Sequence, residues 1–91
     1  MAEPYLLPRK LDLPAAAPLA SDLKERLGAD LTLDAGEVAQ IGALCTQVIA
    51  ATAISLNAGG HSLRLVNASD RLVEQLQNLG FSPESLAEVH A

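Results

Sequence analysis

The sequence predicts a single α/β domain in which a small mixed β-sheet carries helices mainly on one face. Short runs with an apolar residue at every second position alternate along the chain with runs that have one at every third or fourth position. This alternation is typical of crossover connections, which make a sheet largely parallel. The chain has 91 residues, the length of one domain, and 49% of them are hydrophobic, enough for a packed core.

The first expected element is a strand over residues 9–13. Leu11 and Leu13 alternate there with charged residues, so one face is apolar. Pro8 precedes the run and lacks the N–H that a central strand needs, which favours an edge strand or one arm of a broken hairpin. Pro14 ends it.

A helix follows, with Pro18 in its first turn, where a missing N–H costs little. Leucine recurs at every fourth position, at Leu19, Leu23 and Leu27, and the charged residues lie off this stripe. Gly28 comes directly after the stripe and is expected to end the helix.

A second strand is predicted over residues 30–35, and a long helix over residues 41–57 ends at Gly59 and Gly60. On a helical wheel one stripe is expected to be buried: Ile41, Leu44, Cys45, Val48, Ala51, Thr52 and Ser55. The opposite side is expected to be exposed although it carries no charge: Thr46, Ala50, Ala53, Ile54 and Asn57. An exposed uncharged surface on a small domain often marks a protein contact.

A third strand is expected over residues 61–67, followed by a helix that Asn67 or Ser69 caps and Gly80 ends. Phe81 should pack back on the core. Residues 82–91 are predicted as a helical extension of a core that spans about residues 9–81, with Ser82 as its N-cap, Pro83 at its first position and its end near Val89.

The composition excludes several classes of function. The net charge of −5 argues against nucleic-acid binding. The sequence has no paired carboxylates, no Ser-His-Asp order and no glycine-rich phosphate loop. We therefore expect neither an enzyme nor a bound cofactor. Cys45, His61 and His90 have no metal-site spacing, and both histidines are expected at the surface or at a strand edge. The lone cysteine and the absence of a signal or spanning segment predict a cytoplasmic protein without membrane insertion.

Four stretches, in this order, resemble the STAS domain, the fold of anti-sigma-factor antagonists. They are Lys-Leu-Asp-Leu at residues 10–13, Leu-Thr-Leu-Asp-Ala-Gly-Glu-Val at 31–38, Gln-Ile-Gly-Ala-Leu-Cys-Thr-Gln-Val-Ile at 40–49, and Gly-His-Ser-Leu-Arg-Leu-Val-Asn-Ala-Ser at 60–69, with Leu72, Leu76 and Gly80 beyond. The resemblance implies a non-enzymatic regulatory module of bacterial signalling, in sigma-factor control, chemotaxis or a two-component system. Its partner would be a kinase-like ATPase, an anti-sigma factor or another signalling protein. An accessory subunit of a phospholipid-transport ABC ATPase is an alternative.

The resemblance also locates a phosphoacceptor position, where this chain has no Ser or Thr. In phosphorylated STAS domains a Ser or Thr follows an Asp at the start of the second helix. Here Gly42 stands at the Asp position, and Ala43 and Leu44 follow it without a hydroxyl. Thr46 is the nearest substitute, so a phosphorylated switch through Thr46 is a further alternative.

The partner is expected at the edge where the second strand ends and the second helix begins. Strand carboxyl ends and helix amino ends converge there, and STAS domains meet their partners around this position. The candidate contact residues are Asp34, Gly36, Gln40, Gly42, Ala43, Thr46, Gln47 and Ala50. Asp34 would either anchor this edge or form an Asx turn. Cys45 would be either a small buried hydrophobe or a reactive thiolate. A second copy of the chain is an alternative partner.

Overall fold

The computed structural model describes residues 4–82 and 85–86. Its main sheet has the order β1-β3-β5, with β1 at Tyr5–Leu6, β3 at Leu31–Asp34 and β5 at Leu63–Val66. A second pair joins β2, Lys10–Leu11, to β4, Gln40–Ile41. All pairings among the described residues are parallel, in place of the mixed sheet expected. The helices are the 3₁₀ helix η1, Leu13–Ala15, and α1, Ala16–Lys24, α2, Ala43–Ala58, and α3, Asp70–Asn78.

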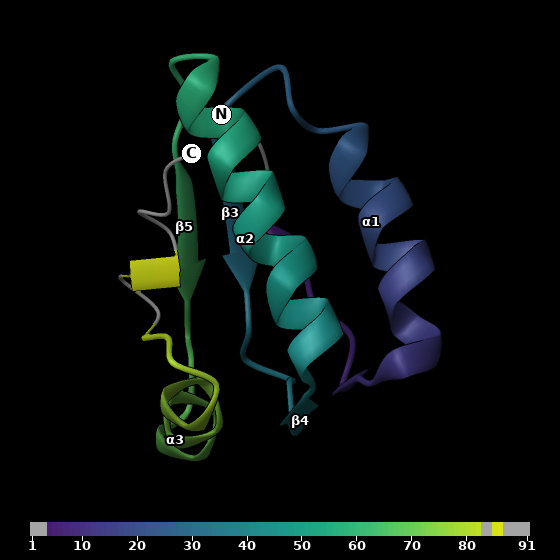
Figure 1. The fold of residues 1–91 in the computed structure, drawn as a ribbon, viewed down its shortest axis with the longest axis vertical. Helices are drawn as coiled ribbons and strands as arrows, with labels where there is room; N and C mark the ends of the chain where they lie inside the picture. Colours follow the sequence, from purple (N-terminus) through teal and green to yellow (C-terminus); the bar gives the residue numbers. More distant parts are fainter. Residues whose placement is uncertain (1–3, 83–84, 87–91) are drawn as a thin grey trace.

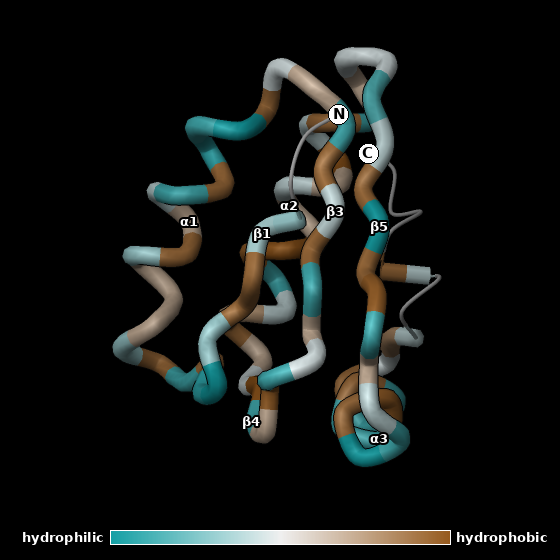
Figure 2. Tube along the Cα trace, turned by 180° about the vertical axis from the view of Figure 1, so that it is seen from behind, coloured by the Kyte–Doolittle hydropathy of each residue, from teal (hydrophilic) through white to brown (hydrophobic). Residues whose placement is uncertain are grey.

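The main sheet carries α1 and α2 side by side on one face (Figure 1). Seen from behind, its strands lie in front of α2, and α1 lies to the left of them (Figure 2). The third helix, α3, lies beyond the carboxyl end of β5, at the same end of the molecule as β4 (Figure 1). The predicted class, one α/β domain with helices mainly on one face, is confirmed.

The strand expected over residues 9–13 is shorter than predicted, and a further strand precedes it. Only Lys10–Leu11 is extended and paired, because Pro14 in the first turn of η1 starts a helix at Leu13. The additional strand Tyr5–Leu6 forms one edge of the described main sheet. The buried core therefore also includes Leu7, which lies before residue 9.

The first helix is displaced towards the amino terminus relative to its prediction. It starts at Ala16 and ends at Lys24, and residues 25–28, which include Gly28, form turns. Leu19 and Leu23 are buried as expected. Leu27 lies outside the helix but still packs against the core. The fourfold spacing of leucines therefore continues beyond the end of the helix.

The second helix lies where it was predicted, but its buried side is different. Ile41 pairs in β4, and α2 starts at Ala43. Its buried residues are Cys45, Thr46, Ile49, Ala50, Thr52, Ala53 and Leu56. Its exposed residues are Ala43, Leu44, Gln47, Ala51, Ser55 and Ala58. The expectation that Thr46, Ala50 and Ala53 are exposed is therefore wrong, because this charge-free helix has almost no amphipathic asymmetry from which to read its orientation.

Glycine ends α2 and α3 in the same way, as predicted. Gly60 and Gly80 have φ angles of 82° and 89°, which other residues rarely adopt. At α3 the N–H of Phe81 donates to the carbonyl of Leu76 and that of Gly80 to Gln77, the two bonds of a Schellman motif. Phe81 then packs against the core as expected.

Two serine hydroxyls accept backbone N–H groups three residues further along the chain. Ser69 Oγ accepts the N–H of Leu72 at 3.1 Å and so caps α3, while Asn67 takes a φ of 60°. Ser82 Oγ accepts the N–H of Ser85 at 3.0 Å, as its predicted N-cap role requires. Pro83 and the predicted end near Val89 lie outside the described residues. Among the residues that are described, no helix is long and apolar enough to cross a membrane.

Candidate functional site

The loop after β3 is held by the carboxylate of Asp34. Its Oδ1 accepts the Gly36 N–H at 2.8 Å, so the Asx-turn interpretation is confirmed. The same oxygen accepts a hydrogen bond from the Asn67 side chain at 3.1 Å, which joins the loops after β3 and β5. A Cβ at Gly36 would lie 3.1 Å from this oxygen, so glycine suits the tight turn. Asp34 is half-buried and acts as a structural anchor of this edge.

The amino end of α2 is bonded to residues 11 and 12, where β2 ends and η1 is about to begin. Gly42, the N-cap residue, donates its N–H to the carbonyl of Leu11 at 2.9 Å. Cys45 Sγ donates to the carbonyl of Asp12 at 3.3 Å. The residues next in sequence to these bonded ones, Leu13 and Leu44, are 73% and 44% exposed. Two leucines are thus exposed to solvent, Leu13 at the start of η1 and Leu44 at the start of α2.

Thr46 and Ala50, both predicted to touch a partner, face the core. Thr46 is 1% exposed, and its hydroxyl donates to the carbonyl of Gly42 at 2.9 Å. Ala50 is 9% exposed. The enclosed hydroxyl is also poorly placed to accept a phosphate. Of the other expected contact residues, Gly36, Gln40, Ala43 and Gln47 are exposed, and Asp34 and Gly42 are half-buried.

Cys45 is a buried side chain in a setting that disfavours its thiolate. Burial raises the pKa of its thiol, and the negative charge of Asp12 raises the pKa further. A reactive cysteine needs the opposite, a lowered pKa and an accessible sulfur. The interpretation of Cys45 as a small hydrophobe is the one that this environment supports.

An uncharged strip runs along the exposed side of α2. We call it the α2 surface and define it by Leu13, Ala43, Leu44, Gln47, Ala51 and Ser55. A groove of about 310 Å³ between α1 and α2 borders it and is lined by Ala20, Lys24, Leu27, Val48, Ala51, Thr52 and Ser55. Leu13 was not among the candidate residues predicted from the sequence, and Leu44, Ala51 and Ser55, which are exposed, were predicted to lie on the buried stripe. Only the lack of charge in α2 pointed to this surface.

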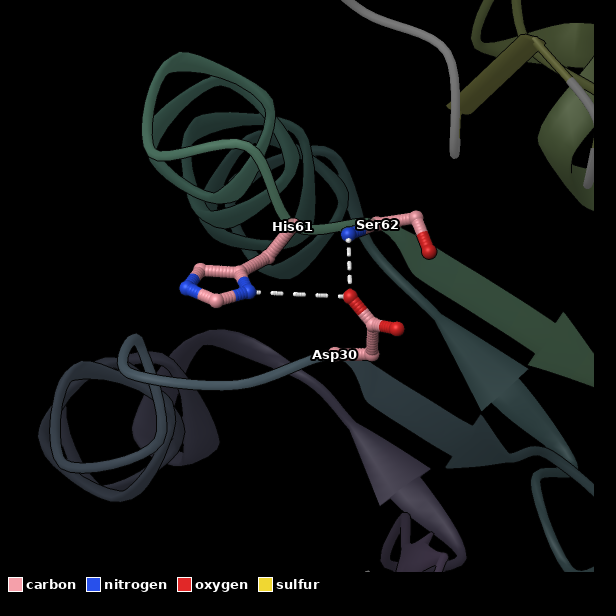
Figure 3. Close-up of polar contacts among 3 residues, drawn as sticks. All are labelled: Asp30, His61 and Ser62. Atoms are coloured by element: carbon pink, nitrogen blue, oxygen red, sulfur yellow. Dashed lines mark hydrogen bonds and ion pairs between the residues drawn. The ribbon is translucent and has the colours of Figure 1, made fainter.

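His61 joins a polar cluster at the amino ends of the strands (Figure 3). Asp30 Oδ1 accepts the Ser62 N–H at 3.0 Å and lies 3.7 Å from His61 Nδ1. The contact ties the loop before β3 to the start of β5, so this cluster has a structural role at a strand edge. His90 lies outside the described residues.

The side chains of the described residues form no group of three or more His, Cys, Asp or Glu that could hold a metal ion. No protein-family model, curated protein or solved structure matches this chain. The resemblance to the STAS domain therefore stays a prediction.

Proposed function

We propose that this chain is a non-enzymatic module that binds a protein partner through the α2 surface. One observation carries the proposal: the exposed side of α2, a helix of 16 residues, has no charged side chain anywhere along its length. An exposed helix of a small domain ordinarily carries Lys, Arg, Asp or Glu on its solvent side. A charge-free strip instead lowers the cost of desolvation when another protein covers it.

The two exposed leucines support the same surface. Leu13 and Leu44 are 73% and 44% exposed, and both are large enough to act as anchors in a partner's pocket. The groove between α1 and α2 offers a complementary hollow for a side chain of the partner. The groove shares Ala51 and Ser55 with the α2 surface, so one partner can contact both.

The STAS resemblance supplies the class of partner. We infer a kinase-like ATPase domain or another signalling component of a bacterial cytoplasm, bound without phosphorylation of this chain. The positions that follow Gly42 carry no hydroxyl, and the hydroxyl of Thr46 is buried. An accessory subunit of a transporter ATPase would dock through the same surface. Identifying the partner distinguishes this role from the signalling role.

The test compares glutamate substitutions of two exposed alanines. Ala51→Glu places a charge within the α2 surface, and Ala29→Glu places the same charge at an exposed position before β3, outside the α2 surface and outside the lining of the groove. Partners captured from native lysate are quantified by mass spectrometry for both variants and the unsubstituted chain. We expect Ala51→Glu to lose a signalling or transporter ATPase by tenfold or more, because docking would bury an unpaired charge, while Ala29→Glu retains it.

Two outcomes decide against the proposal. If both variants capture the partner equally, the contact lies elsewhere. If the unsubstituted chain captures no protein through the α2 surface, the proposed function is wrong. Sedimentation velocity on the purified chain adds a check: self-association that Ala51→Glu abolishes would identify the partner as a second copy.

A further inference from the structure

A second hollow lies between α3 and the paired strands β2 and β4. Its volume is about 490 Å³, within the range of small-molecule sites. It is lined by Arg9, Lys10, Ala39, Gln40, Arg71, Glu74, Gln75 and Asn78. We call it the basic groove. It does not include any residue of the α2 surface, so a ligand in the groove would not depend on the proposed function.

The basic groove concentrates positive charge in an acidic protein. Three of the six Lys and Arg residues of the chain line it, against one carboxylate, although the net charge is −5. None of the three forms an ion pair with a described residue, since Asp30–His61 is the one ion pair found within residues 4–82 and 85–86. Arg26, by contrast, lies over the ring of Tyr5 at 4.9 Å. The cations of the groove are therefore available to an external anion.

The walls of the groove are fixed to each other by hydrogen bonds. Gln75 on α3 accepts the Ile41 N–H at 3.0 Å and donates to the carbonyl of Ala39 at 3.1 Å. The carbonyl of Arg9 accepts the N–H of Ala39 at 2.8 Å, which ties β2 to β4. The backbone positions of Arg9, Lys10 and Arg71 are thus set before a ligand arrives, which reduces the ordering cost of binding.

We propose that the basic groove binds a small phosphate-bearing molecule. Arginine pairs with phosphate through two parallel hydrogen bonds, and lysine adds a compact charge. Two arginines and a lysine suit a ligand with two or more negative charges better than a single carboxylate. The lining has no aromatic side chain that could stack on a base or ring, so the phosphate groups carry the recognition.

The test titrates the full chain with inorganic pyrophosphate and, in a second arm, with glycerol phosphate, at low ionic strength. Binding is followed by calorimetry and by backbone amide shifts. We expect saturable binding with shifts at Gln40, Arg71 and Gln75. Stronger binding of pyrophosphate would assign the groove to a diphosphate, and stronger binding of glycerol phosphate would assign it to a phosphomonoester; both support the proposal.

Arg71→Gln and Arg64→Gln form a matched pair. Both remove one exposed arginine, but Arg64 lies on β5, outside the groove. We expect Arg71→Gln to weaken binding about tenfold or more, and Arg64→Gln to change it less than about twofold. Arg9→Gln provides a second groove variant should Arg71→Gln disturb α3, as circular dichroism would report.

Three results would overturn the proposal. The first is the absence of saturable binding at millimolar pyrophosphate or glycerol phosphate. The second is an equal loss of affinity in the Arg71 and Arg64 variants, and the third is tighter binding of a glutamate-rich peptide than of either phosphate. The second would show a general charge effect, and the third would reassign the groove to an acidic protein segment.

Discussion

Cys45 links the folding of the domain to the titration of a thiol. Its pKa is raised in the folded protein, first by burial and then by Asp12. The folded state therefore holds the proton more tightly than the unfolded chain, and stability falls as the pH rises above the ordinary thiol pKa of about 8.5. Below that pH the thiol is protonated in both states and contributes no pH dependence.

The corresponding prediction compares the natural chain with Cys45→Ala in urea melts at pH 7 and pH 10. We expect the natural chain to lose more unfolding free energy over this interval than the variant, because the variant lacks the buried thiol. Tyr5 also has a raised pKa, through burial and its hydrogen bond to Asp22, but it is present in both proteins and cancels in the comparison. Equal losses would contradict the enclosed position of Cys45.

Thr46 shows why residue type did not reveal which side of α2 is buried, and Thr52, which was expected to be buried, behaves in the same way. The hydroxyl of Thr46 donates to the carbonyl of Gly42, and that of Thr52 donates to Val48, each at 2.9 Å. A hydroxyl that bonds the carbonyl one turn earlier no longer needs water, so threonine can enter the core. A wheel that treats Thr46 as polar and exposed cannot foresee this.

At the scale of elements, adjacent alanines of α2 give a direct test of its orientation. Ala50 is 9% exposed and belongs to the core cluster, whereas Ala51 is exposed. We expect Ala50→Glu to cost more than about 3 kcal/mol of unfolding free energy or to prevent folding, because it buries an unpaired charge. Ala51→Glu should change stability by less than about 0.5 kcal/mol.

Thermal and urea melts followed by circular dichroism measure both variants. The opposite order, a stable Ala50 variant and an unfolded Ala51 variant, would mean that α2 is rotated the other way. The Ala51 variant must also fold normally before its loss of a partner can be interpreted.

Elements with strong patterns were predictable from the sequence, and weakly patterned ones were not. Leu31 and Leu33 mark β3, and a serine cap and a terminal glycine bound α3. The strand Tyr5–Leu6 has two residues, too few for a period, and it is defined by pairing with β3, which is distant in the sequence. In the same way, the sequence predicted the bounds of α2 to within two residues but not the side of α2 that meets solvent.

For the whole molecule, the two candidate surfaces differ in chemistry. The α2 surface is uncharged, and the basic groove is cationic within a chain of net charge −5. The groove requires α3 to reach β4, and the hydrogen bonds of Gln75 make that connection. The position of α3 beyond the end of β5 therefore makes it one wall of the groove, while its buried Leu72 and Leu76 join the core (Figure 1).

The central strand β3 should dominate the stability of the domain. Leu33 is 0% exposed and pairs with Tyr5 on one side and Leu65 on the other. Leu65 lies on β5, at an edge of the described sheet, and is half-buried. Truncation of Leu33 removes a side chain that is enclosed on every side, and the rigid neighbours cannot close the cavity. The same truncation at Leu65 leaves a space that solvent already reaches in part.

We expect Leu33→Ala to cost about 2–5 kcal/mol, a large share of the roughly 5–10 kcal/mol that a chain of this length has. Leu65→Ala should cost about 1–2 kcal/mol, because less apolar surface is withdrawn from water at that position. Urea denaturation followed by circular dichroism gives both values, provided that the dependence on urea is unchanged between variants. A cost below about 1 kcal/mol for Leu33→Ala, or a larger cost for Leu65→Ala, would mean that the core is centred on β5 rather than β3.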